Sequence, residues 1–350
     1  MLQASFKKHT LQFKIPGGTS RGVLKSKDSW FIFVWDENNP EVKGIGECSI
    51  IRGLSTDPWQ AFEAILKKLV ADINNHKWWM DEGLISFPAI RFGLETALKD
   101  LQLGGNRLLF PSAFSEGKQA IPINGLIWMG EYDFMRKQII EKIESGFQCI
   151  KLKIGSLNFE KELELLKLIR KDFNENELEL RVDANGAFLP QEALEKLYRL
   201  AELQVHSIEQ PIRHNQWEEM SKLCENTPVP IALDEELVGI QTEKELEKML
   251  WTIGPQYIIL KPSLLGGWKQ SEIFIREAEK QNIGWWVTSA LESNIGLNAI
   301  AQWTAILNNS LPQGLGTGQL FTNNIPSPLH IKKAELYFNP QIDWDLNLIE

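Results

Sequence analysis

Five short apolar runs follow one another between residues 149 and 263, and each carries a charged residue at or near its end. They read CIKLKIG (149–155), LRVDANG (180–186), VHSIEQP (205–211), PIALDEE (230–236) and YIILKPS (257–263). Subtracting residue numbers gives intervals of 30, 26, 25 and 27 between Lys153, Asp183, Glu209, Asp234 and Lys261. Each interval has room for one strand, one crossover helix and two short loops. The spacing therefore predicts consecutive β/α units whose charged residues meet at one end of a parallel sheet.

The same alternation extends on both sides of these runs. Further strands are predicted at 122–128, 284–293 and 312–318, the last of them short and glycine-rich. Helices are predicted at 132–146, 158–173 and 295–307. Eight strand candidates at near-regular spacing predict a TIM-like α/β barrel over residues 116–324.

A smaller α+β domain is predicted for residues 1–115. Its strands are expected at 5–14, 29–35 and 42–49, and its helices after Asp57 and Pro58, which suit the N-cap and first helical position, and at 88–101. In the tail, 325–350, the segment 329–338 is a candidate strand that could return to this domain.

The segment PGGTSRGVLKSKD (16–28) joins the first two of these strands and offers little to bury. It fits a solvated loop and an active-site flap about equally well, and the sequence does not separate the two.

Composition excludes several kinds of partner. The 350 residues are 43% hydrophobic and 24% charged, as in ordinary globular proteins, and the formal charge of −9 argues against binding nucleic acid or an anionic membrane. We see no apolar run of about 18 residues and no apolar core of a signal peptide near the N-terminus. Three widely separated cysteines, Cys48, Cys149 and Cys224, lead us to expect a reduced cytoplasmic protein. The sequence does not indicate its oligomeric state.

Two lysines in the first run have the spacing of a proton-transfer site. Lys151 and Lys153 share one face of a strand because side chains alternate, as do Arg181 and Asp183 in the next run. If both lysines point inward, each lowers the pKa of the other, and a lysine tuned in this way can act as a general base.

Asp183, Glu209 and Asp234 end three consecutive predicted strands. Three carboxylates without His or Cys suit a hard cation, Mg²⁺ or Mn²⁺. A ligand there would also meet Arg181, Lys151 or Lys261, which favours a small carboxylate substrate bound to the metal. Together these groups predict abstraction of the proton next to a carboxylate, with a stabilised enediolate, leading to racemisation, elimination or cycloisomerisation.

Each element of this pattern also has a simpler interpretation. A lone KxK is most often a solvated strand edge, and a single Asp or Glu after a strand is more often a helix N-cap than a metal ligand. The order Lys, Asp, Glu, Asp, Lys on successive strands favours the catalytic interpretation.

These motifs resemble the enolase superfamily, in its muconate-lactonising subgroup, over nearly the whole chain. The resemblance rests on KLK (151–153), RVDANG (181–186), IEQP (208–211), ALDE (232–235) and LKPS (260–263). It implies an N-terminal α+β capping domain and a modified (β/α)7β barrel. By matching motifs, it implies Asp183, Glu209 and Asp234 as ligands of Mg²⁺, Lys153 as the base and Lys261 as the opposing lysine.

Further motifs narrow the resemblance to the o-succinylbenzoate synthase family of menaquinone biosynthesis. They are LKPSLLGG (260–267), TSALESNIGL (288–297) and GLGTGQLF (314–321). The implied reaction is a Mg²⁺-dependent syn dehydration of 2-succinyl-6-hydroxy-2,4-cyclohexadiene-1-carboxylate to 2-succinylbenzoate. The resemblance also implies Asn185 and Glu235 around the metal, and Ser263, Ser289 and Gly316 as substrate contacts. Lys151 and Arg181 complete the candidate site as the charged neighbours inferred above.

Other activities share parts of this pattern. N-succinylamino acid racemases and dipeptide epimerases share both lysines and all three carboxylates, but the epimerases usually carry Asp-x-Asp at the last barrel strand, where this chain has GLGTG (314–318). SALESNIG (289–296) disfavours a cycloisomerase of aromatic catabolism. A non-catalytic barrel is disfavoured because none of the five charged residues is missing.

Overall fold

The computed structural model describes residues 1–19 and 22–349. In this part of the chain, three antiparallel strands form an N-terminal sheet in the order β1 (Leu2–Thr19), β2 (Gly22–Asp36) and β3 (Asn39–Ser49). The helices α1 (Phe62–Ala71) and α3 (Pro88–Gln102) follow it. Between these helices lie the short elements η1 (Ile73–Asn75), α2 (His76–Trp78) and η2 (Trp79–Gly83).

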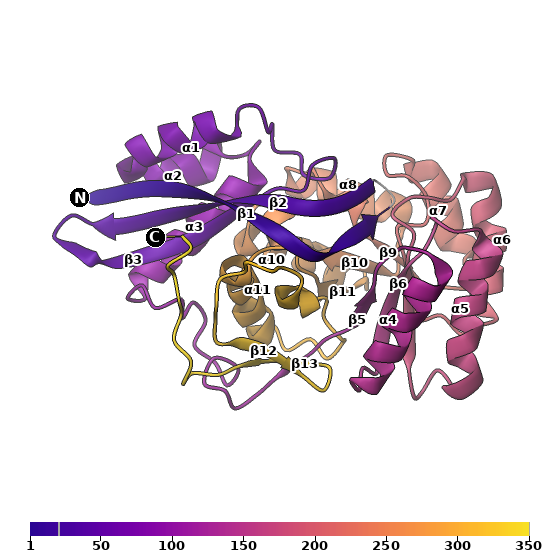
Figure 1. The fold of residues 1–350 in the computed structure, drawn as a ribbon. Helices are drawn as coiled ribbons and strands as arrows, with labels where there is room; N and C mark the ends of the chain where they lie inside the picture. Colours follow the sequence, from indigo (N-terminus) through magenta and orange to yellow (C-terminus); the bar gives the residue numbers. More distant parts are fainter. Residues whose placement is uncertain (20–21, 350) are drawn as a thin grey trace.

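The three N-terminal strands lie where the sequence predicted strands. Both faces of the sheet that they form carry buried side chains. Alternate residues of β2, among them Ile32 and Val34, pack against α1 and α3, while Phe31 and Phe33 point to the opposite face. That opposite face packs on Ile295 of the helix α11 (Asn294–Ile306) and on the end of the chain at Ile349. This packing places the N-terminal sheet above one end of the parallel strands (Figure 1).

A second sheet is formed, among the described residues, by seven parallel strands in the order β11-β10-β9-β8-β7-β6-β5. The strands are β5 (Gly125–Ile127), β6 (Cys149–Lys153), β7 (Glu179–Asp183), β8 (Ser207–Glu209), β9 (Ile231–Leu233), β10 (Tyr257–Leu260) and β11 (Gly284–Val287). This order confirms the predicted succession of parallel β/α units, since each strand pairs with the next one in sequence.

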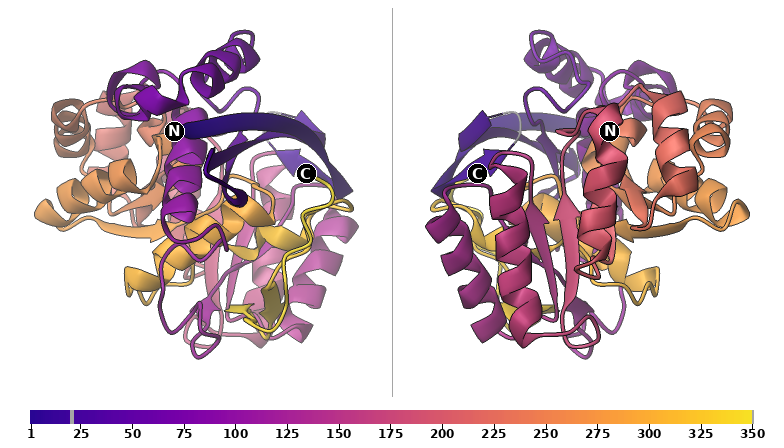
Figure 2. Two further views of the ribbon diagram at one scale, coloured as in Figure 1. Left: turned by 90° about the vertical axis from the view of Figure 1, so that its left-hand side faces the viewer. Right: turned by 90° about the vertical axis from the view of Figure 1, so that its right-hand side faces the viewer.

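Helices connect these strands and cover their outer side (Figure 2). They are α4 (Tyr132–Glu144), α5 (Phe159–Asp172), α6 (Pro190–Ala201), α7 (Trp217–Asn226), α8 (Glu243–Ile253), α10 (Trp268–Lys280) and α11 (Asn294–Ile306), with the short helices η3 (Glu235–Leu237) and α9 (Pro262–Leu265). The apolar faces of the strands and helices form the largest hydrophobic core of the molecule. Burial of this core is the main favourable contribution to stability.

Residues 312–318 were predicted as an eighth strand, but the structure contains no strand there. Two isolated parallel bridges lie in this segment, Gln313 with Ile123 and Gly314 with Thr288, and the short helix η4 (Gly316–Gln319) follows. The Gly314 N–H donates to the Val287 carbonyl at 2.8 Å. The segment therefore links the two edges of the parallel sheet. It forms only isolated bridges and no continuous hydrogen-bonded ladder, because glycine weakens a strand.

The tail pairs with a different element from the one predicted. Its strands β12 (Leu329–Lys332) and β13 (Glu335–Phe338) form a hairpin that pairs with β4 (Ile121–Pro122), not with the N-terminal sheet. After this hairpin the chain returns to the N-terminal sheet near β3, where Trp344, Leu346 and Ile349 join its hydrophobic cluster (Figure 1).

The predicted loop at 16–28 is largely strand. β1 runs to Thr19 and β2 starts at Gly22, while residues 20 and 21 lie outside the described part. Contacts far along the chain explain this extension: the Lys14 N–H donates to the Leu320 carbonyl at 2.8 Å, and Gly18 bridges to Met129. A Cβ at Gly18 would lie 2.4 Å from the Met129 oxygen, so this approach requires glycine.

The prediction that Asp57 caps the helix that follows it was wrong. That helix starts at Phe62, and no side chain caps it. Asp57 is buried and accepts the Ala89 N–H at 3.1 Å, so it caps α3 instead.

Among the described residues, no helix is both long enough and apolar enough to cross a membrane.

Candidate active site

The charged residues of the five runs lie next to one another at the ends of adjacent strands. In the strand ladder Lys153 pairs with Asp183, and Asp183 pairs with Glu209. Asp234 directly follows β9, and Lys261 directly follows β10. The order read from the sequence is therefore an order in space, because consecutive strands are neighbours in this sheet.

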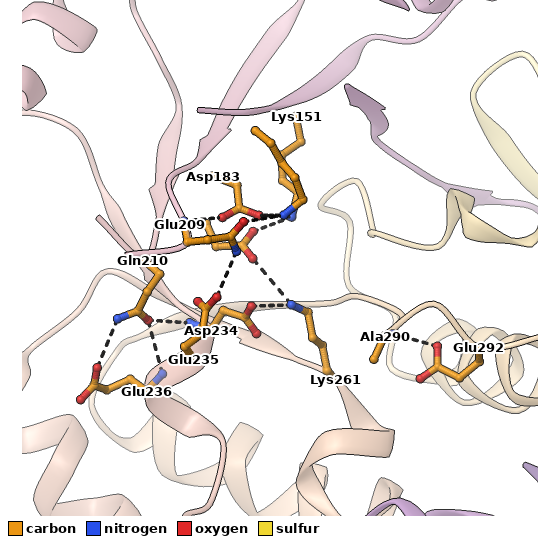
Figure 3. A network of polar contacts seen from close by, with 12 residues as sticks. Lys151, Asp183, Glu209, Gln210, Asp234, Glu235, Glu236, Lys261, Ala290 and Glu292 are labelled. Carbon is orange, nitrogen blue, oxygen red and sulfur yellow. Dashed lines mark hydrogen bonds and ion pairs between the residues drawn. The ribbon is translucent and has the colours of Figure 1, made fainter. Parts of the chain in front are cut away.

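Three lysine ammonium groups bind three carboxylates at this end of the sheet. Lys151 donates to Glu209 at 2.6 Å, Lys153 donates to Asp183 at 2.7 Å, and Lys261 donates to Asp234. In Figure 3 Lys151 and Lys261 approach the carboxylates from different sides. All of these side chains are buried or nearly so, which strengthens their mutual attraction.

Side chains of neighbouring loops hold these groups in place. Asn185, with φ of 44°, accepts from Lys153 at 2.8 Å and donates to Glu235 at 3.0 Å, so it joins the ends of β7 and β9. Gln210, which the sequence analysis did not select, accepts the Asp234 N–H at 3.3 Å and donates to Glu236 at 3.2 Å (Figure 3). Its place directly after Glu209 in IEQP was the available signal.

The predicted lowering of the Lys151 pKa by Lys153 was wrong. Burial acts to lower the pKa of Lys151, but the Glu209 and Asp183 carboxylates outweigh it and raise the pKa. These carboxylates lie 2.6 Å and 3.5 Å from the Lys151 ammonium. The prediction considered only the neighbouring lysine, and the tertiary structure adds two opposite charges within 3.5 Å of the Lys151 ammonium.

Opposite charges also determine the pKa directions of Asp183 and Lys261. Burial acts to raise the pKa of Asp183, but Lys153 and Lys151 outweigh it and hold this pKa below its ordinary value. Burial acts to lower the pKa of Lys261, but Asp234 and Glu209 outweigh it and raise this pKa. Both residues are therefore charged at neutral pH.

The chemistry of the donors fits a hard cation. Asp183, Glu209 and Asp234 supply only oxygen atoms, and the Glu209 Oε1 is buried with no hydrogen-bond partner among the described residues. The Lys261 ammonium lies 3.8 Å from this oxygen. Over residues 1–19 and 22–349, no three His, Cys, Asp or Glu side chains already surround a common metal position. The three carboxylates are instead bonded to lysines.

A pocket opens over this charged cluster. Lys151, Lys153, Asp183, Asn185 and Lys261 line it. Most of its other lining residues carried no motif in the sequence. They are polar at Asn124, Thr288 and Thr317 and apolar at Leu24, Ile51, Leu54, Leu126, Trp128, Leu291 and Leu320. Gly22, Val23 and Leu24 of the β1–β2 hairpin belong to this lining, which agrees with the flap interpretation of that segment.

The remaining predicted site residues divide into two groups. Ser289 and Gly316 line the pocket, and Ser289 shares a hydrogen bond with Thr317. Ser263 does not line it, since its buried hydroxyl donates to Glu292.

Arg181 also lies apart from the pocket lining, although it shares a strand face with Asp183. Its guanidinium binds Glu179 at 2.6 Å and the Pro312 carbonyl at 2.9 Å and stacks on Trp286, nearer the start of the strands. The alternation of side chains along β7 predicted correctly that Arg181 points to the same side as Asp183. Arg181 stands two residues earlier in the strand, however, and therefore lies farther from the strand end at which the pocket opens.

Comparisons with known proteins agree with this geometry. Residues 135–339 match the family model described as enolase C-terminal domain-like. The chain is 47% identical over 361 residues to the o-succinylbenzoate synthase of Desulfotalea psychrophila, covering 94% of this chain and 97% of that protein.

Solved structures give the same fold. The crystal structure of MenC from Desulfotalea psychrophila LSv54 superimposes with a TM-score of 0.85 at 44% identity, covering 96% of this chain and 99% of that one. A dipeptide epimerase from Cytophaga hutchinsonii, complexed with Mg and a dipeptide, gives a TM-score of 0.84 at 20% identity, covering 100% and 98%. Because the identity to the dipeptide epimerase is only 20%, this similarity shows a shared fold and nothing about activity.

Proposed function

The chain belongs to the enolase C-terminal domain-like family, and we propose that it acts as an o-succinylbenzoate synthase. The observation that carries the proposal is the 47% identity to such an enzyme over 94% of this chain. The reaction is a hydro-lyase reaction: 2-succinyl-6-hydroxy-2,4-cyclohexadiene-1-carboxylate loses water and becomes 2-succinylbenzoate.

Lys153 is the proposed base. As the neutral amine, it takes the proton from the carbon next to the substrate carboxylate, and it then gives that proton to the departing hydroxyl group, so that water leaves. Lys261 stabilises the negative charge of the enediolate with its ammonium group, whose pKa is raised by Asp234 and Glu209. Both lysines line the same pocket, which supports these roles.

Asp183, Glu209 and Asp234 are proposed to hold Mg²⁺, for which Mn²⁺ could substitute. When bound, the ion supplies positive charge beside the substrate carboxylate. Asn185 and Glu235 orient the surrounding groups through their hydrogen bond at 3.0 Å, and Lys151 neutralises Glu209. Ser289 and Gly316 are proposed substrate contacts because both line the pocket.

We further propose that the parallel sheet and the segment at Gln313 and Gly314 form a modified (β/α)7β barrel at residues 116–324, capped by residues 1–115. The bridges of this segment to both edges of the sheet support that description. We propose a cytoplasmic enzyme with a small carboxylate substrate and with neither nucleic acid nor membrane as partner. Three buried free cysteines and the charge of −9 support this assignment.

An N-succinylamino acid racemase or dipeptide epimerase would use the same lysines and carboxylates. The pocket wall at Gly314 and Gly316 carries no carboxylate in GLGTG, which disfavours the epimerase.

The test follows the ultraviolet absorbance of the cyclohexadiene substrate after mixing with protein and Mg²⁺. We expect rapid Mg²⁺-dependent conversion, its loss in Lys153→Ala, and no change in the control Lys222→Ala, since Lys222 is an exposed residue of α7. Deuterium exchange at the α-carbon of an N-succinylamino acid, without dehydration, would move the assignment to a racemase. No reaction in either assay would refute the synthase.

A further inference from the structure

A buried polar cluster joins the N-terminal sheet to the segment that follows β11. Lys27 on β2 is 6% exposed, and its ammonium donates to the Leu291 carbonyl at 2.8 Å and to the Ser49 hydroxyl. Two fully buried carboxylates, Glu47 and Glu292, attract the same ammonium. Because a buried charge needs close partners to offset its lost hydration, the position of Lys27 is fixed by these groups.

The two carboxylates hold the backbone on either side of Leu291. Glu292 accepts the Ala290 N–H at 2.8 Å (Figure 3). Glu47 on β3 accepts the N–H of Ser293 at 2.9 Å and that of Gly296 at 3.0 Å. Residues 290–296 are thus attached through their backbone to groups of the cluster.

Leu291 itself has an unfavourable backbone conformation. Its φ is 63°, in the left-handed region that a bulky side chain rarely adopts, and such a conformation persists only where the surroundings enforce it. Ala290 and Leu291 both line the pocket, and Leu291 packs in one hydrophobic cluster with Trp128 and Leu24. The strained residue is therefore part of the pocket wall.

We propose that Lys27 is a positioning residue for substrate binding: by holding the Leu291 carbonyl, it fixes the left-handed turn that presents Ala290 and Leu291 to the apolar part of the substrate. The chemical identity of that substrate rests on the proposed function. β2 also carries Leu24 into the pocket three residues before Lys27, so the same strand supplies one lining residue and holds the backbone of another, Leu291.

The first test compares Lys27→Met with Leu250→Ala. Met keeps the length and apolar stem of lysine and removes the donor. Leu250 is a fully buried residue of α8 outside the pocket, so its truncation lowers stability without touching the pocket walls. We expect Lys27→Met to raise KM about tenfold with a much smaller effect on kcat, and Leu250→Ala to leave KM unchanged.

A second test uses the strain at Leu291. Glycine adopts positive φ without cost, whereas alanine keeps the left-handed penalty, so Leu291→Gly and Leu291→Ala differ in strain while both lose the leucine side chain. With Lys27 present, we expect their KM values to agree within about threefold, because the lysine enforces the turn. In the Lys27→Met background, we expect the Gly variant to have a KM about tenfold below that of the Ala variant.

Two kinetic results would overturn the proposal: a KM for Lys27→Met no higher than that of Leu250→Ala, or a ratio of the Gly and Ala KM values at position 291 that is the same in both backgrounds. Amide hydrogen exchange of residues 288–294 provides a readout that needs no reaction. Faster exchange in Lys27→Met than in wild type is expected even if the protein has no synthase activity, and unchanged exchange would also refute the positioning role. A failed synthase assay and a failed positioning role are therefore distinguishable.

Discussion

Glu95 predicts a measurable dependence of stability on pH. Glu95 lies on α3 and is 6% exposed. Its carboxyl group accepts the N–H groups of Trp268 at 2.9 Å and Lys269 at 3.4 Å, at the start of α10. Burial raises the pKa of Glu95 from 4.5 to about 7, although the two N–H groups act in the opposite direction. The folded protein therefore retains a proton that the unfolded chain loses near its ordinary pKa.

The size and sign of the effect follow from this difference. The pKa values differ by 7 − 4.5 = 2.5, which corresponds to about 3 kcal/mol at 1.36 kcal/mol per unit. Between pH 4.5 and about 7 the folded state binds more protons than the unfolded state, so the free energy of unfolding falls as pH rises through this window. Below this pH window Glu95 is protonated in both the folded and the unfolded state. Above the window, the stabilisation that the buried proton contributed is lost completely.

The assay compares urea unfolding of wild type and Glu95→Gln across this window. Glutamine has the same shape, offers a carbonyl oxygen to the α10 N–H groups and does not titrate. We expect the stability of wild type relative to the variant to fall by about 3 kcal/mol as pH rises from 4.5 to above 7. Parallel pH profiles for the two proteins would refute the reasoning, because every other titrating group contributes equally to both.

Three further predictions concern the site. Gly18→Ala places a Cβ 2.4 Å from the Met129 oxygen and therefore displaces the β1–β2 hairpin. We expect steady-state kinetics to show a KM raised about tenfold or more. An unchanged KM would show that the hairpin does not shape the pocket. Asn185→Gly removes one of the two acceptors of Lys153 and keeps a residue that adopts a φ of 44° without strain. We expect kcat to fall about 10- to 100-fold with stability nearly retained, and full activity would contradict the role of Asn185. Glu209→Gln should weaken Mg²⁺ binding about 100-fold or more in calorimetric titration, and equal affinity would exclude this residue as a ligand.

Local features of the sequence determined the succession of parallel strands and the positions of their terminal charges. Strand periodicity placed Lys153, Asp183, Glu209, Asp234 and Lys261 at strand ends, and the regular intervals made consecutive strands neighbours. Both properties depend only on neighbours along the chain and on the handedness of β/α units, so they can be read without coordinates.

Only the tertiary structure decided which groups meet across large sequence separations. It turned the polar segment at 16–28 into a hairpin over the pocket, because its glycines contact Trp128 and Met129. It assigned Asp57 to a helix 31 residues later, at Pro88, and directed Ser263 away from the pocket towards Glu292.

Charge interactions between residues far apart in the sequence were likewise decided only by the tertiary structure. From the sequence, Lys151 had only Lys153 as a charged neighbour. In the fold the Glu209 and Asp183 carboxylates lie 2.6 Å and 3.5 Å from the Lys151 ammonium and raise its pKa instead of lowering it. Lys27 and Leu291, 264 residues apart, carry no local signal at all. The sequence determined which residues stand at strand ends, and the folded structure determined their partners, because electrostatic and packing energies depend on distances in space.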